Sequence, residues 1–170
     1  MHYAAFLNLR NKACVVVGGG TIATRKVQKL LQAKADVTVI SPDVHPNLEG
    51  LIANGRVRHL ARAYQPTDLA HATLAFAATD NRAVNASVAR DAAASGIWCN
   101  VADDREACDF MVPAVHQHGK VQIAISTSGH SPALAKRLRE ALEEDLADGG
   151  RRFYDLLTSC QIDDPQQAGD

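Results

Sequence analysis

Several features that mark particular classes of protein are scarce in this sequence. Aromatic residues make up only 5% of its 170 residues, too few for the stacked aromatic platforms that bind single-stranded nucleic acid. The formal net charge is −1, so the chain lacks the basic surface that binds nucleic acid or anionic lipid. We therefore expect neither a nucleic acid nor a membrane as a partner.

Long hydrophobic runs and paired cysteines are missing as well. No apolar run approaches the roughly 18 residues of a membrane span, and the N-terminus lacks the charged and apolar regions of a signal peptide. The four cysteines form no CxxC pair, so reduced, buried thiols are expected. His116 and His118 have no third ligand near them in the sequence, and no metal site is expected. These absences predict a cytoplasmic protein.

Residues 12–41 have the pattern of a β-strand, a helix and a second β-strand. Ala13–Val17 is a short continuous apolar run, typical of a parallel strand that is buried on both faces. Three glycines interrupt the pattern at 18–20, a helical apolar face follows over 21–33, and 37–40 is β-branched. This order predicts a parallel βαβ unit.

The alternation continues to about residue 112. Strands are predicted at 56–60, 73–78 and 97–101, with a loop at 64–66 and a helix over 81–95 that ends at Gly96. Strands that alternate with helices predict an α/β fold with a Rossmann-like, doubly wound parallel sheet. We assign residues 1–112 to this domain.

The pattern changes in residues 113–170. Alternating residues around Gly119 predict a hairpin with Pro113 on an edge strand. Ser131 and Pro132 open a helix that carries an apolar stripe, Gly149-Gly150 ends it, a second helix is predicted at 151–160, and 161–170 should fray. The stripe consists of Leu134, Leu138, Leu142 and Leu146. These elements are too few for a core of their own. They would cover either the Rossmann-like body or a second copy of the chain, and we expect a homodimer.

The glycine turn has the spacing of a dinucleotide-binding fingerprint, Gly18-x-Gly20-x-x-Ala23. In that fingerprint the first glycine permits a tight turn, the second lets the backbone approach a pyrophosphate, and the small third residue allows close packing of helix and strand. The helix N-terminus at Thr21 would face the phosphates. The alternative is a glycine turn that binds nothing.

Ser41-Pro42-Asp43 occupies the position where this fingerprint places an acid that binds the ribose. Ser41 offers a hydroxyl, Asp43 would repel a 2′-phosphate, and no arginine stands there to bind one. The segment therefore favours NAD over NADP. Alternatively, Asp43 is only a turn residue.

Ligands of doubly wound sheets lie at the carboxyl ends of the strands, where the sequence places Thr79-Asp80 and Asn100–Asp104. An aspartate there is a candidate general base beside a nicotinamide ring, or a solvated loop carboxylate. No Tyr-x-x-x-Lys pair follows Tyr64 or Tyr154, which excludes the chemistry of short-chain dehydrogenases.

The helix from Pro132 carries Lys136, Arg137 and Arg139 in its first half and acidic residues in its second. The helix dipole favours the opposite order. These cations form either a solvated face with an i,i+4 pair or a basic cluster that collects carboxylates behind the N–H groups of 126–131.

Taken together, these motifs resemble one family, precorrin-2 dehydrogenase, which is also the N-terminal region of siroheme synthase. The similarity spans about residues 4–147. Its motifs are Phe6–Leu9, Val17–Gly20, Arg25-Lys26, Ala77–Asp80, Asn85, Cys99–Asp103, Cys108–Phe110, Pro113 and Ser126–Ala135 with the pattern Ser-Thr-x-Gly-x-Ser-Pro-x-Leu-Ala.

The resemblance implies NAD-dependent oxidation of precorrin-2, an octacarboxylate tetrapyrrole, to sirohydrochlorin in a homodimer. It assigns the essential carboxylate to Asp103, with Asp104 one residue away. It assigns the dinucleotide to Thr21, Ile22, Pro42 and Asp43, beside Gly18, Gly20, Ser41 and Thr79. The expected substrate contacts are Asn100, Ser126, Thr127, Gly129, His130, Ser131, Lys136 and Arg137.

Two alternatives and one departure accompany this resemblance. Some members also insert iron into sirohydrochlorin with the same carboxylate, and a non-catalytic NAD-sensing module would keep the glycine turn without needing Asp103. The departure is Ala33-Lys34-Ala35, where family members commonly have a glycine at the end of the first helix.

Overall fold

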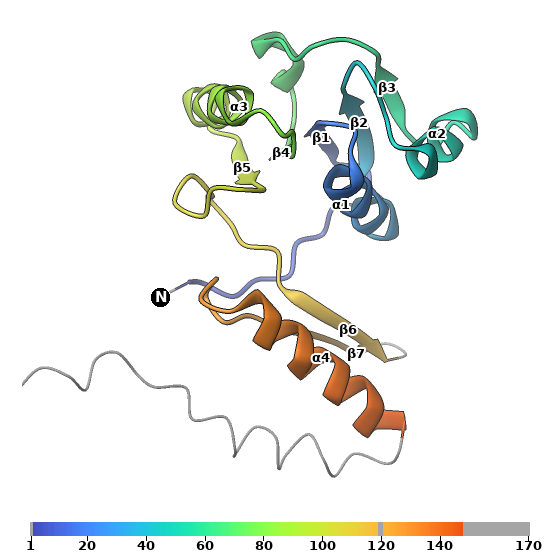
Figure 1. Cartoon of the computed structure of the whole chain (residues 1–170), viewed down its shortest axis with the longest axis vertical. Coiled ribbons are helices and arrows are strands. Elements are labelled where there is room, and N and C mark those ends of the chain that lie inside the picture. Colours follow the sequence, from blue (N-terminus) through green and yellow to red (C-terminus); the bar gives the residue numbers. More distant parts are fainter. Residues whose placement is uncertain (1, 119–120, 148–170) are drawn as a thin grey trace, which may run out of the picture. The chain divides into compact units, whose positions relative to one another are not determined.

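The structure, a computed structural model, describes residues 2–118 and 121–147. They belong to two compact units. The larger comprises residues 3–111, and the smaller consists of residue 2 and of the described residues from Val112 onward. The elements of both units are labelled in Figure 1.

A five-stranded sheet, entirely parallel, forms the centre of the larger unit, and its strand order is β3-β2-β1-β4-β5. The order reverses between β1 and β4, which is the switch point where such sheets bind ligands. The predicted α/β, Rossmann-like fold is confirmed. The strands are β1 (Ala13–Val17), β2 (Asp36–Ile40), β3 (Arg58–Leu60), β4 (Leu74–Ala77) and β5 (Trp98–Val101).

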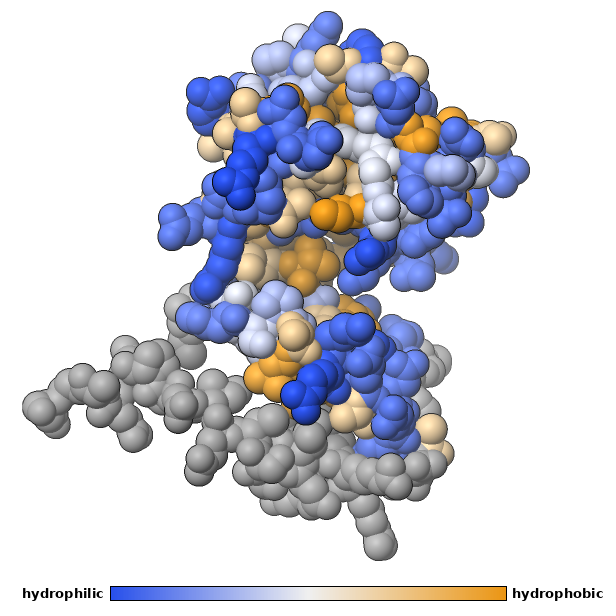
Figure 2. Space-filling view, viewed as in Figure 1, coloured by the Kyte–Doolittle hydropathy of each residue, from blue (hydrophilic) through white to orange (hydrophobic). Residues whose placement is uncertain are grey.

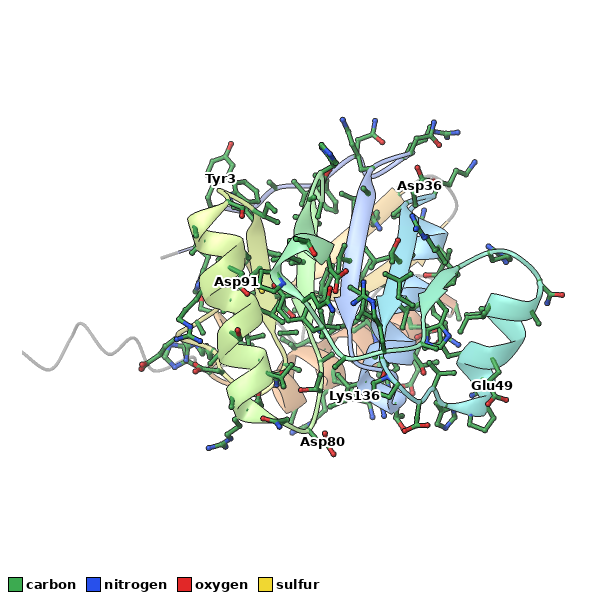
Figure 3. All side chains as sticks on the ribbon, turned by 90° about the horizontal axis from the view of Figure 1, so that it is seen from above. Tyr3, Asp36, Glu49, Asp80, Asp91 and Lys136 are labelled. Atoms are coloured by element: carbon green, nitrogen blue, oxygen red, sulfur yellow. The ribbon has the colours of Figure 1, made fainter. Side chains whose placement is uncertain are left out.

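Helices cover both faces of this sheet because alternate strand residues point to opposite sides. Val16, Val39 and Phe76 face a cluster with α1 (Thr21–Gln32) and α2 (Pro46–Ala53). Val17, Ala77 and Val101 face α3 (Arg82–Ala94) and the short 3₁₀ helix η1 (Pro66–Leu69). Side chains fill both layers when the sheet is seen from above, with Asp36 and Asp80 at opposite ends of the strands (Figure 3).

Two helices of this unit were not predicted. The helix α2 has only eight residues, one of them fully buried, and its N-cap is the unusual His45, whose Nδ1 accepts a hydrogen bond from Asn47. The helix η1 begins inside the segment predicted as a loop, at Pro66. By contrast, the predicted end of α3 is confirmed, because Gly96 follows Ser95 with a φ of +67°.

The end of α1 departs from the usual choice of residue. Lys34, directly after the cap residue Ala33, has a φ of +60°. This left-handed conformation favours glycine and costs other residues about 1–2 kcal/mol. The sequence therefore places a lysine where the backbone conformation favours glycine.

The smaller unit contains a hairpin and one helix. Strands β6 (Ala114–His118) and β7 (Val121–Ile125) pair in antiparallel fashion, and α4 (Pro132–Ala147) packs against both. Ser131 caps α4, since its hydroxyl accepts a hydrogen bond from the Leu134 amide at 3.2 Å, as predicted. Leu138 and Leu142 of the predicted stripe are buried, while Leu134 and Leu146 are half-buried. The helix predicted at 151–160, Gly149-Gly150 and the tail lie outside the described residues.

Hydrophilic side chains cover much of the visible surface of the larger unit (Figure 2). Among the residues that the structure describes, none of the helices combines the length and the hydropathy needed to cross a membrane.

Candidate functional site: a fixed carboxylate and a glycine turn at one end of the sheet

The glycine turn between β1 and α1 is built by two close approaches of backbone. Gly18 has a φ of +115°, and a Cβ there would overlap the Ala78 carbonyl oxygen. A Cβ on Gly19 would overlap the Asp43 carbonyl oxygen. A Cβ on Gly20, by contrast, would meet no atom within 4 Å. The turn thus leaves open space at Gly20, the residue predicted to approach a pyrophosphate.

The two residues after this turn begin α1. Thr21 and Ile22 are exposed, and the Ile22 side chain keeps 52% of its surface accessible. Ala23 is fully buried, as the close packing of helix on strand requires. The first turn of α1 therefore presents its amide groups at the same end of the sheet as the glycines.

The segment that follows β2 lies against the glycine turn. The His45 amide donates to the Gly19 carbonyl at 2.8 Å, and Ser41 Oγ lies 2.9 Å from where a Gly19 Cβ would be. Ser41 is half-buried, while Pro42 and Asp43 are exposed. The structure thus brings Ser41, Pro42 and Asp43 together with the glycines, as the fingerprint predicts.

Asp103, which follows β5, is held by a buried asparagine of α3. Asn85 is 1% exposed and its Nδ2 donates to Asp103 Oδ1 at 2.9 Å. Arg82 Nε lies 3.4 Å from Asp103 Oδ2, but its side chain is 87% exposed, so that ion pair is weak. Asn85 is therefore the main group that orients the Asp103 carboxylate, which remains one-third exposed.

The same asparagine also fixes Thr79, which follows β4. Asn85 Oδ1 accepts from the Thr79 amide at 3.1 Å and lies 2.7 Å from the Thr79 hydroxyl. Asn85 Nδ2 donates in addition to the Thr79 carbonyl at 3.0 Å. One buried side chain thus joins the ends of β4 and β5 at the edge where ligands bind.

Asp104 has a different environment from Asp103. Its Oδ1 accepts hydrogen bonds from the amides of Glu106 and Ala107 at 3.0 and 3.2 Å. This is the arrangement of an Asx turn, in which the side chain stabilises the loop that follows β5. The two neighbouring aspartates therefore differ in what their oxygens contact.

A cavity of about 660 Å³ lies beside Asp103. It runs between α3 and the loop that follows β5, so it opens on the α3 side of the sheet. Its lining combines small apolar side chains, two cations, an amide and both neighbouring carboxylates: Ala83, Ala86, Ala89, Val101, Ala107, Arg82, Arg90, Asn85, Asp103 and Asp104.

Asn100 of β5 points to the other face of the sheet and contacts a lysine of α1. Lys26 Nζ donates to Asn100 Oδ1 at 2.6 Å, and Asn100 Nδ2 donates to the Phe110 carbonyl at 2.9 Å. The ammonium also lies 5.2 Å from the centre of the Phe76 ring. Burial is the main cause that lowers the pKa of Lys26 below its ordinary value.

The remaining predicted substrate residues lie in the smaller unit. The Thr127 hydroxyl accepts from the Ser131 amide, Ser126 Oγ accepts from the Ser128 amide, and Gly129 has a φ of +77°. These contacts shape the turn before α4 that also contains His130. Lys136 and Arg137 are exposed on α4, with Lys136 3.7 Å from Glu140. Their role as substrate contacts stays a prediction.

Sequence reasoning assigned no role to Asn85, Lys26 or Arg82. Asn85 and Lys26 did stand in the motifs that carry the family resemblance, which was the available signal. Their partners lie 18 and 74 residues away in the chain, so only the fold reveals the contacts. Within residues 2–118 and 121–147, no three His, Cys, Asp or Glu side chains group as metal ligands would.

Comparison with known proteins matches both units. Residues 5–114 match a family described as putative NAD(P)-binding, and residues 118–144 match one described as sirohaem biosynthesis protein central. The siroheme synthase of Methylobacillus flagellatus is 46% identical over 138 residues, which are 81% of this chain and 30% of that protein. The siroheme synthase of Chromobacterium violaceum is 40% identical over 151 residues, 89% of this chain and 32% of that one.

The chain thus spans about a third of the length of these curated relatives. A solved structure, SirC, precorrin-2 dehydrogenase, superposes with a TM-score of 0.72 at 32% sequence identity. That match covers 92% of this chain and 75% of SirC.

Proposed function

Because the chain belongs to the family described as putative NAD(P)-binding and superposes on SirC, precorrin-2 dehydrogenase, we propose that it oxidises precorrin-2 to sirohydrochlorin with NAD as cofactor. The observation that carries this proposal is the Asp103 carboxylate, which Asn85 fixes at 2.9 Å beside an open cavity. A carboxylate held in this way at the carboxyl end of a parallel strand is placed to act on a bound ligand.

The residues of the glycine turn fit a dinucleotide. Gly20 leaves room for a pyrophosphate, and the amides at Thr21 and Ile22 begin a helix whose N-terminus favours anions. A dinucleotide held there would supply the hydride acceptor for the oxidation. Ser41, Pro42 and Asp43 would hold the ribose, and Thr79 would lie near the nicotinamide end.

Asp103 is the proposed general base. Removal of two hydrogens from precorrin-2 releases one hydride and one proton, and the Asp103 carboxylate accepts that proton. Asn85 donates to Oδ1, so it orients the carboxylate without occupying both oxygens. Asp104 is the weaker candidate, because two backbone amides already use its Oδ1.

We test this function by supplying purified protein with precorrin-2 and NAD and following the formation of NADH by its absorbance. The wild type should form NADH, and Asp103→Asn should abolish turnover while NADH still binds. Asp104→Asn is the matched control and should retain turnover and stability, because the asparagine Oδ1 can accept the same two amides. Absence of NADH formation by the wild type would contradict the dehydrogenase assignment, and loss of turnover in Asp104→Asn alone would move the base by one residue.

The preference for NAD rests on the exposed Asp43 carboxylate beside the glycine turn. A 2′-phosphate would meet this negative charge, so NADP should have a higher KM than NAD. Asp43→Ser should narrow that difference by lowering the KM for NADP. An unchanged ratio of the two KM values would show that Asp43 does not select the cofactor.

We also propose that residues 113–170 pair subunits and help to hold the tetrapyrrole through Ser126, Thr127, Gly129, His130, Ser131, Lys136 and Arg137. Val121 on β7 keeps 59% of its surface exposed, and a second subunit would cover this apolar side chain. Light scattering on the purified chain should give the mass of a dimer. A monomer at micromolar concentration would contradict this arrangement.

A further inference from the structure

Lys26 is a partly buried cation whose surroundings differ from those of the other described cations near the sheet. Its side chain leaves α1, crosses Phe76 of β4 and reaches Asn100 of β5. Phe76 and Asn100 are register partners in neighbouring strands, each the last residue but one of its strand. The ammonium therefore lies over β4 and β5, close to the end of the sheet where ligands bind.

Within the described part of the chain, no carboxylate pairs with this ammonium. Among the described residues, ion pairs within 4 Å join Arg62 to Asp68, Arg82 to Asp103, and Lys136 and Arg139 to glutamates of α4. None of these ion pairs involves Lys26. Desolvation of an ammonium without a counter-charge costs free energy, in agreement with the lowered pKa of Lys26.

The neighbours of Lys26 hold it in place without neutralising it. Asn100 accepts one of the three N–H donors, and Asn100 is itself fixed because it donates to the Phe110 carbonyl. The Phe76 ring supports the ammonium through its π face and packs edge-on against Phe110. Such an arrangement pre-orients the remaining donors toward an anionic ligand.

The position of Lys26 indicates which anionic ligand its ammonium would bind. The pyrophosphate site belongs to the glycine turn after β1, whereas the ammonium contacts β5, two strands away, which is about 10 Å. The ammonium lies on the α1 face of the sheet, whereas the cavity beside Asp103 opens on the α3 face. Both lie at the carboxyl ends of β4 and β5, so a large ligand that spans this edge would meet the ammonium and Asp103 together, and we assign the anion to the molecule on which Asp103 acts.

We propose that Lys26 binds a carboxylate of the tetrapyrrole substrate, with Asn100 as the residue that positions its ammonium. This inference rests on the proposed function, because it takes the substrate from there. It assigns to α1 a second role beyond the dinucleotide, and it gives Asn100 an indirect part in substrate binding through Lys26.

The test uses the full chain and an inert octacarboxylate porphyrin, uroporphyrin, whose fluorescence reports binding without turnover. Lys26→Met keeps an unbranched side chain over Phe76 but removes the charge. It should raise the Kd for uroporphyrin and the KM for precorrin-2 about tenfold or more, the value of a lost charge-assisted hydrogen bond. The Kd for NADH should stay within about twofold of the wild type.

Lys29→Met is the matched control, because Lys29 is exposed on the same helix and its loss changes the net charge equally. It should bind uroporphyrin as the wild type does. Asn100→Asp is a second variant, which keeps Lys26. Asn100 Oδ1 lies 2.6 Å from the Lys26 ammonium, so the aspartate would put a carboxylate beside that ammonium and neutralise it. It should weaken uroporphyrin binding as Lys26→Met does.

Three results would overturn the proposal. The first is that Lys26→Met binds uroporphyrin as tightly as the wild type, and the second is that Lys29→Met weakens this binding as much as Lys26→Met does. The third is that Lys26→Met loses affinity for NADH and not for uroporphyrin, which would assign the anion to the dinucleotide. Failure of the proposed function has a different signature. In that case the wild type binds uroporphyrin in a Lys26-dependent manner but forms no NADH from precorrin-2.

Discussion

Replacement of Asn85 by alanine removes the side chain that links Thr79, after β4, to Asp103, after β5. This side chain is 1% exposed and makes its hydrogen bonds to Thr79 and Asp103. Alanine keeps the helix propensity of α3 high, so the loss is confined to those contacts. The variant therefore measures how firmly α3 holds the ends of β4 and β5.

The expected cost follows from the groups that lose their partner. The Thr79 amide and carbonyl each lose a hydrogen bond. An unsatisfied backbone group costs about 1–3 kcal/mol when it is fully buried, and Thr79 is half-buried, so the low end of this range applies. The Thr79 hydroxyl retains Asn81 as a neighbour, and Asp103 is one-third exposed and can be hydrated. Counting only the two backbone groups near the low end of that range, Asn85→Ala should lose about 2–3 kcal/mol of unfolding free energy.

Urea unfolding followed by circular dichroism measures this loss, and Asn47→Ala, which removes an exposed asparagine side chain from α2, is the control. The control should stay within about 0.5 kcal/mol of the wild type. Turnover of Asn85→Ala should fall more than its NADH affinity, since Asp103 loses its orienting donor. A stability loss below about 1 kcal/mol, or full turnover, would refute the role given to Asn85.

Three further predictions concern other parts of the larger unit. Gly19→Ala should destabilise the protein by about 1–3 kcal/mol and weaken NADH binding, because its Cβ would overlap the Asp43 carbonyl. Gly20→Ala has open space around its Cβ, so it should weaken NADH binding while the urea midpoint stays unchanged. Lys34→Gly should stabilise the protein by about 0.5–1 kcal/mol, since Lys34 has a φ of +60°; a lower melting temperature in calorimetry would contradict this. Arg62 donates hydrogen bonds to Asp68 at 2.6 and 2.8 Å and lowers the pKa of that carboxyl. A lowered pKa stabilises the fold above the ordinary pKa of an aspartate, and this contribution disappears as the pH falls through the folded value. The difference in urea midpoint between wild type and Asp68→Asn should therefore shrink from about pH 7 to about pH 3. A difference that persists in acid would exclude the ionised Asp68–Arg62 pair as its cause.

Local patterns in the sequence were sufficient to predict most of the larger unit. The sequence predicted β1 from the apolar run at Ala13–Val17, the turn from the glycines, and α1 from the amphipathic segment after them. These predictions were possible because burial on both faces and helical periodicity produce patterns among neighbouring residues. The helix α2 escaped this reasoning, since eight residues with Gly50 in the middle and a histidine cap carry little periodic signal.

The site was less accessible to sequence reasoning than the fold. The motif that contains Asp103 stands in the sequence, but the choice between Asp103 and Asp104 depends on contacts that only the folded chain makes. Asn85 reaches Asp103 from another element, and Lys26 reaches Asn100 across 74 residues. Such contacts arise from tertiary packing, which periodicity and spacing do not encode.

The contact between Gly19 and Asp43 has a consequence for how cofactor choice evolves. Asp43 meets the glycine turn through its main-chain carbonyl, while the residue itself is exposed to solvent. A substitution at position 43 therefore changes the side chain presented beside the glycine turn without removing the main-chain carbonyl that packs against Gly19. If the proposed function holds, affinity for the dinucleotide and selectivity between NAD and NADP would be separable by single substitutions in the loop after β2.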